Sequence, residues 1–316
     1  MITHEDQPSA AKHPPGRILL VTDLSCRCDR ALDRAIRLAR AWQAELIVLH
    51  VIEGEDAPDL PAFRRGREAR AELAERLIRS DIGGSGVRFD VVIERGRPAD
   101  VILRKAAELC AGLIVTGIAR EETLTRAILG TTVDRLVRWA PMPVLVVKNR
   151  AHRDYETMVV ASDFSPSSKH ATEQAAALFP EARALLFHAY RVPFAGFLGN
   201  GANRDEIRDQ AQQDCSDFLS RLAVPPEALR KLECRIEHGS ADAVIGAYVW
   251  DNEVDLVALG THGRSGAFDV LVGSTAEILL SYLPCDVLVV REPRAVRRAT
   301  PNAEPSSPEA GTRRPS

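Results

Sequence analysis

The second half of this chain repeats the first half at a nearly constant spacing. The motif PMPVLVV at 141–147 returns as PCDVLVV at 284–290, and four punctuating residues recur 143 positions later. These pairs are Gly96 and Gly239, Gly117 and Gly260, Gly130 and Gly273, and Pro141 and Pro284. Asp23 and Asp163 correspond at a spacing of 140, so the second half has about three more residues than the first between this aspartate and the first of the repeated glycines. The repeat predicts a duplicated chain with two domains of one fold.

Each half alternates short apolar runs with segments of helical periodicity. In the first half the apolar runs lie at 17–25, 45–52, 89–96, 111–117 and 143–147. Strands and helices that alternate in this way predict a parallel sheet with right-handed crossovers and helices on both faces. The predicted class is therefore α/β, with two repeated, doubly wound, five-stranded parallel-sheet domains fused as a pseudo-dimer.

Composition shifts set the expected domain boundaries. Residues 1–15 are polar and proline-bearing, and residues 294–316 are rich in Pro, Ser, Ala and Arg, so both ends are expected to be disordered. The first domain is expected at 16–150 and the second at 155–293, joined by the short segment NRAHRDYE.

The overall charge and the cysteines exclude several classes of function. A net charge of −3 in 316 residues gives no electrostatic case for binding nucleic acid or an anionic membrane surface. No apolar run has the length of a membrane span, and the first residues lack the apolar core of a signal peptide. The six cysteines are irregularly spaced and do not indicate a disulfide framework. We therefore expect a cytoplasmic protein with reduced thiols, in which Cys110, Cys215, Cys234 and Cys285 are structural.

The segment GTHGRSGAFDVLVGST, from Gly260 to Thr275, is the strongest functional signal. It follows the apolar run VDLVAL and precedes TAEILLSYL, so the order is strand, glycine loop and helix start. Such a loop lets backbone N–H groups close on a phosphate, and the helix N-terminus adds the positive end of its dipole. Glycine suits this role because a Cβ would hinder the close approach.

This loop resembles the G-x2-G-x9-G-[S/T] nucleotide loop of the universal stress protein family, at Gly260, Gly263, Gly273 and Ser274. The resemblance covers nearly everything from Arg17 to Arg291 and implies a strand order of 3-2-1-4-5. It also implies pairing through the fifth strands, here Val144–Val147 against Val287–Val290 within one chain, and it leaves a homo-oligomer open. Slow ATP hydrolysis at most is expected, with no catalytic residues assigned.

The resemblance implies an ATP site in the second half, with Mg²⁺ or Mn²⁺ as the accompanying ion. Asp163 would lie near the nucleotide, and the backbone at Ala189 would line the adenine pocket. For His262 we expect the backbone N–H, not the imidazole, to make the contact. The expected ATP-binding residues are Ala161, Ser162, Asp163, Ala189, Leu259, Gly260, His262, Gly263, Gly273, Ser274 and Thr275.

The first half departs from this pattern at one position. Arg120 stands where the second glycine belongs, and its side chain would crowd the phosphate path. Two alternatives are that its guanidinium replaces a cation near the phosphates, or that it is a solvated arginine in a site that lost its ligand. The corresponding residues of this second, degenerate site are Asp23, Val51, Gly117, Arg120, Gly130 and Thr131.

Other candidate residues support a rival function. Cys26 and Cys28 lie at the start of the first helix, where the helix dipole lowers a thiol pKa, and Ser25 is a candidate cap of that helix. The rival is a nucleotide-free scaffold or a redox-responsive interaction protein.

His50 and His188 end matching strands and are interpreted as packed side chains. A Walker P-loop and the S-G-G-x-D-S loop of adenylyl-transferring enzymes are both absent from the sequence. The leading hypothesis is an ATP-binding regulatory module of stress-response type.

Overall fold

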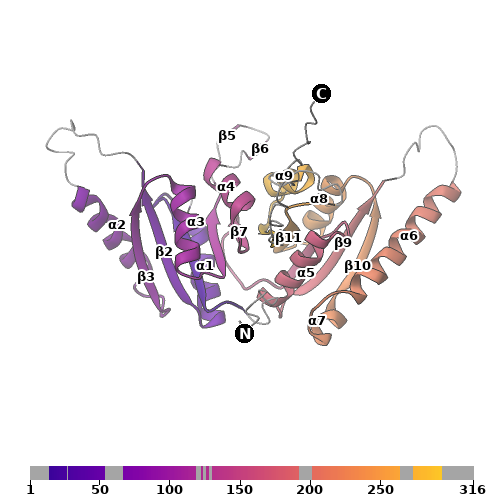
Figure 1. The fold of residues 1–316 in the computed structure, drawn as a ribbon, viewed down its shortest axis with the longest axis horizontal. Helices are drawn as coiled ribbons and strands as arrows, with labels where there is room; N and C mark the ends of the chain where they lie inside the picture. The colour runs from indigo at the N-terminus through magenta and orange to yellow at the C-terminus, as the bar shows by residue number, and fades with distance from the viewer. Residues whose placement is uncertain are drawn as a thin grey trace, which may run out of the picture.

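The two halves fold into two similar α/β domains that lie side by side (Figure 1). The computed structural model describes residues 14–26, 28–53, 67–118, 122–123, 126–127, 130–191, 201–263 and 273–293. The expected disorder of the two ends covers residues 1–15 and 294–316, and all of these except residues 14–15 lie outside the described residues.

The first domain contains four helices and seven strands within the described residues. They are β1 (Arg17–Thr22), α1 (Asp29–Trp42), β2 (Glu45–Ile52), α2 (Arg67–Ile82), β3 (Phe89–Arg95), α3 (Pro98–Glu108), β4 (Leu113–Gly117), β5 (Glu122–Thr123), β6 (Arg126–Ala127), α4 (Thr131–Trp139) and β7 (Val144–Val147). The two-residue strands β5 and β6 form a separate antiparallel pair between β4 and α4.

The second domain follows the same plan with one added helix. Its elements are β8 (Thr157–Ala161), α5 (Pro166–Leu178), β9 (Arg183–Tyr190), α6 (Gly201–Ser220), α7 (Pro226–Lys231), β10 (Glu233–His238), α8 (Ala241–Asp251), β11 (Leu256–Gly260), α9 (Ser274–Tyr282) and β12 (Asp286–Val290). Helix α7 has no counterpart in the first domain, where residues 83–88 connect α2 directly to β3.

The main strands form a single ten-stranded sheet in the order β10-β9-β8-β11-β12-β7-β4-β1-β2-β3. Each domain therefore has the order 3-2-1-4-5, and its strands are parallel. Strand β12 pairs with β7 in the antiparallel direction, with Leu288 opposite Leu145. Within the described residues, no helix has the length and apolar character needed to cross a membrane.

The duplication is also visible in the backbone. Non-glycine residues with positive φ occur at matching places, as Leu24 (61°) and Phe164 (62°) and as Cys110 (50°) and Glu253 (48°). Because most side chains disfavour this conformation, its recurrence shows that both copies keep the same turns.

Alternation along the strands divides the core between the two faces of the sheet. Ile18 and Leu20 point into one apolar cluster, and Leu19 points into the other. The first cluster is covered by α1, α2, α5 and α6, and the second by α3, α4, α8 and α9. Both clusters contain residues of both domains, so apolar burial continues through the β7–β12 pair.

A buried carboxylate joins the two domains. Asp286 is 0% exposed and accepts hydrogen bonds from the backbone N–H groups of Lys148 (2.8 Å) and Asn149 (2.9 Å). The hydroxyl of Tyr155 donates to its other oxygen at 2.6 Å. The Arg34 guanidinium of α1 lies 3.4 Å from the same oxygen and 3.9 Å above the Tyr155 ring. Burial, and then the neighbouring Asp286, raise the pKa of Tyr155 well above its usual value, so the phenol stays a donor.

The ends of the two fifth strands make matching contacts with the opposite domain. The Lys148 amine donates to the carbonyls of Leu280 (2.6 Å) and Leu283 (2.8 Å), at the end of α9. Arg291, which corresponds to Lys148, donates to the carbonyl of Trp139 at the end of α4. Cations at helix C-termini satisfy free carbonyls and are favoured by the helix dipole.

We predict that Asp286→Asn destabilises the protein by about 3–5 kcal/mol, because it leaves Arg34 as a buried, uncompensated charge. The measurement is the free energy of unfolding in urea. Asp154→Asn is the control, since Asp154 pairs with another α1 arginine, Arg37, but its side chain is 73% exposed. Removal of that exposed pair should cost at most about 1 kcal/mol. Equal losses in the two variants would contradict a structural role for the buried cluster.

Candidate functional site

The predicted ATP-binding residues of the second domain gather at the carboxyl edge of its sheet. Strands β8 and β11 are neighbours, and Ala161 lies opposite Leu259 in their register. Ser162 and Asp163 continue from β8, and Gly260 ends β11. Ala189 lies near the end of β9, on the other side of β8. Ligands of open α/β sheets bind at this edge.

A strained turn positions Asp163. Its carboxylate accepts a hydrogen bond from the backbone N–H of Ser165 at 3.1 Å, and the next residue, Phe164, adopts a φ of 62°. The Phe164 ring is stacked on His188 with centroids 4.3 Å apart and packs against Phe218. Left-handed backbone at a bulky residue costs about 1–3 kcal/mol and persists where the surroundings enforce it, commonly at functional sites.

The two loop glycines lie where added side chains would collide with the site. A Cβ on Gly260 would come within 2.8 Å of the Ser167 hydroxyl and 3.1 Å of the Ser167 backbone. A Cβ on Gly263 would come within 2.9 Å of the Asp163 carboxylate. A side chain at position 263 would therefore meet the Asp163 carboxylate, which would have to move to make room for it.

A hydrogen bond between Thr261 and Gly273 ties the two ends of the loop together. The N–H of Gly273 donates to the Thr261 carbonyl at 2.9 Å, which brings the start of α9 beside the end of β11. Gly273 is the N-cap of α9 and makes no side-chain cap bond, and Ser274 and Thr275 are exposed in the first turn. The first backbone N–H groups of a helix have no partners within it, so this end suits an anion. Residues 264–272 of the loop lie outside the described residues.

Both the backbone and the side chain of His262 make contacts within the protein. Its backbone N–H, the expected nucleotide contact, donates to the Ser167 hydroxyl at 3.3 Å. Its Nδ1 lies 2.8 Å from the Thr261 hydroxyl. A ligand that accepts from this N–H would have to displace the Ser167 hydroxyl oxygen, which accepts the long hydrogen bond and can rotate away.

Two buried hydroxyl residues at the site were missed by the sequence analysis. Ser167 is 3% exposed and Thr261 is 1% exposed, and both contact the loop. The run SPSS at 165–168 was an available signal, because serines at a helix start commonly bond to nearby backbone. Ser165 indeed caps α5 by accepting from the Ser168 N–H.

The two histidines at the ends of matching strands have structural partners. Nδ1 of His188 lies 2.8 Å from the Ser162 carbonyl, and Nδ1 of His50 lies 2.9 Å from the Thr22 carbonyl. The same contact in both copies agrees with the interpretation of these residues as packed side chains.

The first domain keeps the frame of the site but differs in its contacts. Gly117 ends β4, Val51 lies on β2, Gly130 is the N-cap of α4, and Thr131 begins that helix. Asp23 accepts from the Ser25 N–H at 2.8 Å and from the Cys28 thiol at 3.2 Å. Burial raises the pKa of Asp23, but these hydrogen bonds outweigh it, and the pKa is lower than usual. Arg120 lies outside the described residues.

Two expectations about the first helix are wrong. Ser25 does not cap α1, because the helix begins later with Cys28 as its N-cap. The helix dipole also fails to lower the Cys28 thiol pKa. Burial raises that pKa to about 11, and the adjacent Asp23 carboxylate contributes to the increase.

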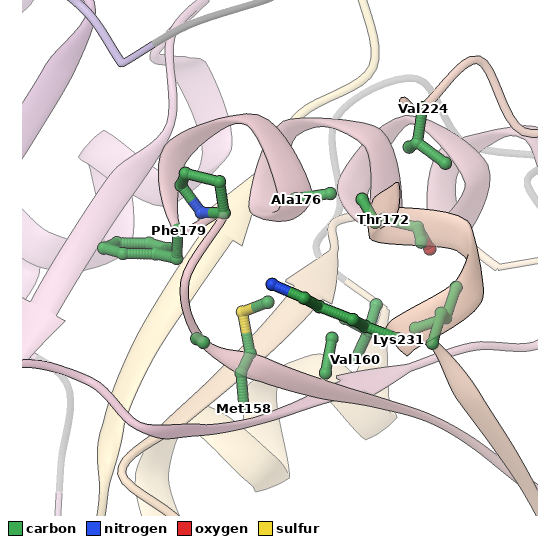
Figure 2. A pocket seen from close by; sticks show the side chains of 12 residues that line it. Met158, Val160, Thr172, Ala176, Phe179, Val224 and Lys231 are labelled. Carbon is green, nitrogen blue, oxygen red and sulfur yellow. The ribbon is translucent and has the colours of Figure 1, made fainter. Parts of the chain in front are cut away.

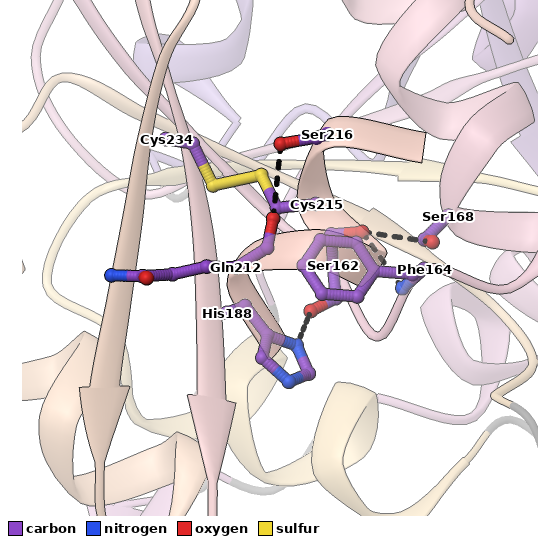
Figure 3. Close-up of a disulfide and its surroundings, with 8 residues drawn as sticks. All are labelled: Ser162, Phe164, Ser168, His188, Gln212, Cys215, Ser216 and Cys234. Atoms are coloured by element: carbon purple, nitrogen blue, oxygen red, sulfur yellow. Dashed lines mark hydrogen bonds between the residues drawn. A yellow bond between two sulfur atoms is a disulfide. The ribbon is translucent and has the colours of Figure 1, made fainter. Parts of the chain in front are cut away.

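The expectation that the cysteines form no disulfide is also wrong. Cys215 of α6 and Cys234 of β10 form a disulfide in the second domain (Figure 3). Sequence spacing could not predict it, because the helix and the strand meet only after the chain folds back through α7. Cys26, Cys28, Cys110 and Cys285 are free, and Cys285 is buried, as expected for a structural thiol.

The comparisons identify the family. The model of the universal stress protein family matches residues 15–148 and again residues 154–291. The fold, with its repeated 3-2-1-4-5 sheets and glycine loop, fits this match, and the chain belongs to the universal stress protein family as a tandem, two-domain member.

Individual relatives agree with this assignment. A universal stress protein of Thermus aquaticus is 36% identical over 135 residues, which cover 42% of this chain and 97% of that protein. One from Methanocaldococcus jannaschii is 29% identical over 143 residues, covering 42% of this chain and 81% of that protein.

Among solved structures, a universal stress protein of Archaeoglobus fulgidus has a TM-score of 0.63 at 19% identity, over 87% of this chain and 98% of that one. A functionally unknown protein of Pseudomonas aeruginosa has a TM-score of 0.61 at 24% identity, over 90% and 95%. At these identities the two structures show a shared fold.

We predict that native Cys28 is nearly inert toward alkylation. With a pKa of about 11 in place of the ordinary 9.0, its thiolate fraction at pH 8 falls by about 100-fold, and the thiolate is the reactive form. Mass spectrometry after iodoacetamide treatment should therefore show Cys28 modified about 100-fold more slowly in native than in denatured protein. Exposed Cys26 serves as the internal reference. Rapid modification of native Cys28 would revive its role as a redox sensor.

Proposed function

We propose that the second domain binds ATP and that the tandem protein acts as a nucleotide-dependent regulatory module. The observation that carries the proposal is the position of Gly263, whose backbone lies so close to Asp163 that a Cβ would meet the carboxylate at 2.9 Å. A glycine at this position, at the carboxyl edge of the sheet and beside a helix N-terminus, suits a site in which backbone N–H groups hold the ligand.

Each part of the site would have a distinct role. The loop backbone at Gly263 and Gly273 and the start of α9 at Ser274 and Thr275 would hold the phosphates. Asp163 would accept from ribose hydroxyls or share a cation with the phosphates, and the backbone at Ala189 would face the base. Ala161, Ser162, Leu259, Gly260 and His262 would form the floor between them.

The accompanying Mg²⁺ or Mn²⁺ would depend on the nucleotide for most of its ligands. Within the described residues, no group of three or more His, Cys, Asp or Glu side chains is arranged to hold a metal. A small divalent cation commonly uses one or two carboxylates together with substrate phosphates, which Asp163 could provide.

Regulation fits this site better than rapid turnover. The imidazole of His262 is engaged with Thr261, and that of His188 with the Ser162 carbonyl, so both are held by local contacts. A bound nucleotide would then act by favouring one conformation over another. We infer that the paired domains work as one fused unit, since the Asp286 cluster links them.

We predict that Gly263→Arg abolishes ATP binding, because the new side chain would collide with Asp163 and enter the phosphate path. Calorimetric titration of the folded variant is the measurement. The control is Gly84→Arg, which adds the same side chain to a glycine with nothing within 4 Å of its Cβ position. Unchanged affinity in Gly263→Arg would show that the site is assigned wrongly.

We also predict that the chain binds one nucleotide and not two. The first domain keeps the other marks of the site, but Arg120 replaces the glycine that lies against the aspartate in the second domain. Arg120→Gly should therefore raise the titrated stoichiometry from about one to about two per chain. If wild-type protein already binds two equivalents and Asp163→Ala removes one, Arg120 is a phosphate ligand and not a block.

The rival function, a nucleotide-free redox-responsive protein, is favoured by the Cys215–Cys234 disulfide. Nucleotide analysis of freshly purified protein separates the two hypotheses, since the rival predicts no bound ATP.

A further inference from the structure

The second domain contains a pocket at the edge of the sheet opposite the candidate nucleotide site. Its floor is formed by the first residues of β8 and β9, its wall by α5, and its cover by α7 and the residues beside it. The lining is apolar except for Thr172 and Lys231 (Figure 2). The Thr172 hydroxyl donates to the Ser168 carbonyl at 2.8 Å, so this polar group is already satisfied within α5.

Several side chains that line the pocket are smaller than their equivalents in the first domain, whereas Phe179 is larger than its equivalent, Ala39. Ala31 and Ala35 of α1 match Ala171 and Ala175 of α5, and all four are 0% exposed, which fixes the alignment of the two helices. In that alignment, and in the matching strand registers, four core residues of the first domain are replaced by smaller ones. The replacements are Leu20 by Val160, Leu32 by Thr172, Ile36 by Ala176 and Leu46 by Ala184.

The missing volume is covered by a structure found only in the second domain. Helix α7 brings Val224, Ala228 and Lys231 over the gap. The segment before it is tied to α5, because buried Glu173 accepts from the Ala223 N–H at 2.7 Å. Covering an apolar gap with a helix, while leaving it unfilled, forfeits packing contacts that the first domain makes.

Lys231 occupies the pocket in an unusual way. Figure 2 shows its side chain extended across the pocket, with the amine directed toward Met158. No hydrogen bond or ion pair reaches this amine from any described residue. Lysine stems usually cover apolar surface while the amine stays accessible, and Lys231 is exposed, so its amine is available to an anionic partner at the pocket. With Lys231 in place, about 20 Å³ remains inside, which is room for about one water.

We propose that this pocket binds an aliphatic monocarboxylate of medium chain length. The alkyl chain of the ligand replaces the Lys231 stem between α5 and the sheet, where Ala176 and Ala184 leave space. The displaced amine, which belongs to an exposed residue and can move outward, pairs with the carboxylate at the mouth. This site is separate from the candidate nucleotide site and does not depend on it.

Octanoate tests the proposal, with methionine methyl resonances as the readout. The chain has three methionines, Met1, Met142 and Met158, and Met158 lines the pocket. Saturable binding of octanoate to the full chain should shift the Met158 methyl resonance and leave that of Met142 unchanged. An absence of saturable binding at millimolar octanoate would overturn the proposal.

Two variants test separately the apolar contact with the alkyl chain and the charge contact with the carboxylate. Ala176→Ile restores the residue of the first domain, fills the pocket and should abolish the Met158 shift. Lys231→Met keeps the stem but removes the charge, so octanoate affinity should fall about fivefold, as for a partly exposed ion pair, while octanol affinity is unchanged. Arg230→Met is the control for Lys231, because Arg230 is adjacent and does not line the pocket.

The outcomes are distinguishable even if Ala176→Ile fails to fold, because Lys231→Met changes only an exposed side chain. Equal octanoate affinity in Lys231→Met and wild type would refute the carboxylate contact. Octanoate binding that survives in folded Ala176→Ile would place the ligand elsewhere.

Discussion

The arrangement of the two domains depends on Asp286, a carboxylate with no exposure to solvent. Its two oxygens are satisfied by backbone N–H groups of the first domain's last strand, by the Tyr155 hydroxyl and by the charge of Arg34. A buried charge is tolerated only when such partners surround it, and here the partners come from three separate segments of the chain. The cluster adds polar contacts to the apolar burial around the antiparallel β7–β12 pair, and both sets of contacts are made in the register that is observed.

Around this joint the two copies have diverged in opposite ways. The first domain has large core side chains under α1 and Arg120 at the position of the second loop glycine. The second domain has both loop glycines, several smaller core residues under α5, the additional helix α7 and a disulfide.

Much of the fold could be predicted because it depends on local patterns. The α/β class, the tandem architecture and the position of the glycine loop follow from apolar runs, glycines and the repeat at Gly117 and Gly260. The strand order was implied only by the resemblance to the universal stress protein family. The features that escaped prediction depend on distant residues. The raised pKa of the Cys28 thiol results from burial beside Asp23, and the Cys215–Cys234 bond requires α6 to meet β10. Asp286 looks in the sequence like an ordinary loop carboxylate, and only the folded chain brings Arg34 and Tyr155 to it. Ser167 was within reach of prediction, since its serine-rich turn precedes a helix.

Fusing the domains through their fifth strands also determines which sheet edges face solvent. The ten-stranded sheet ends at β3 and β10, and both carry charged residues along their length, such as Asp90 and Glu94 on one and Arg235 and Glu237 on the other. Glu94 is further engaged by Lys105 and Arg104 of α3, and Arg235 pairs with Glu237. Charged side chains on an outer strand discourage another strand from pairing with it. Pairing of a further strand at either end of the ten-stranded sheet is therefore disfavoured.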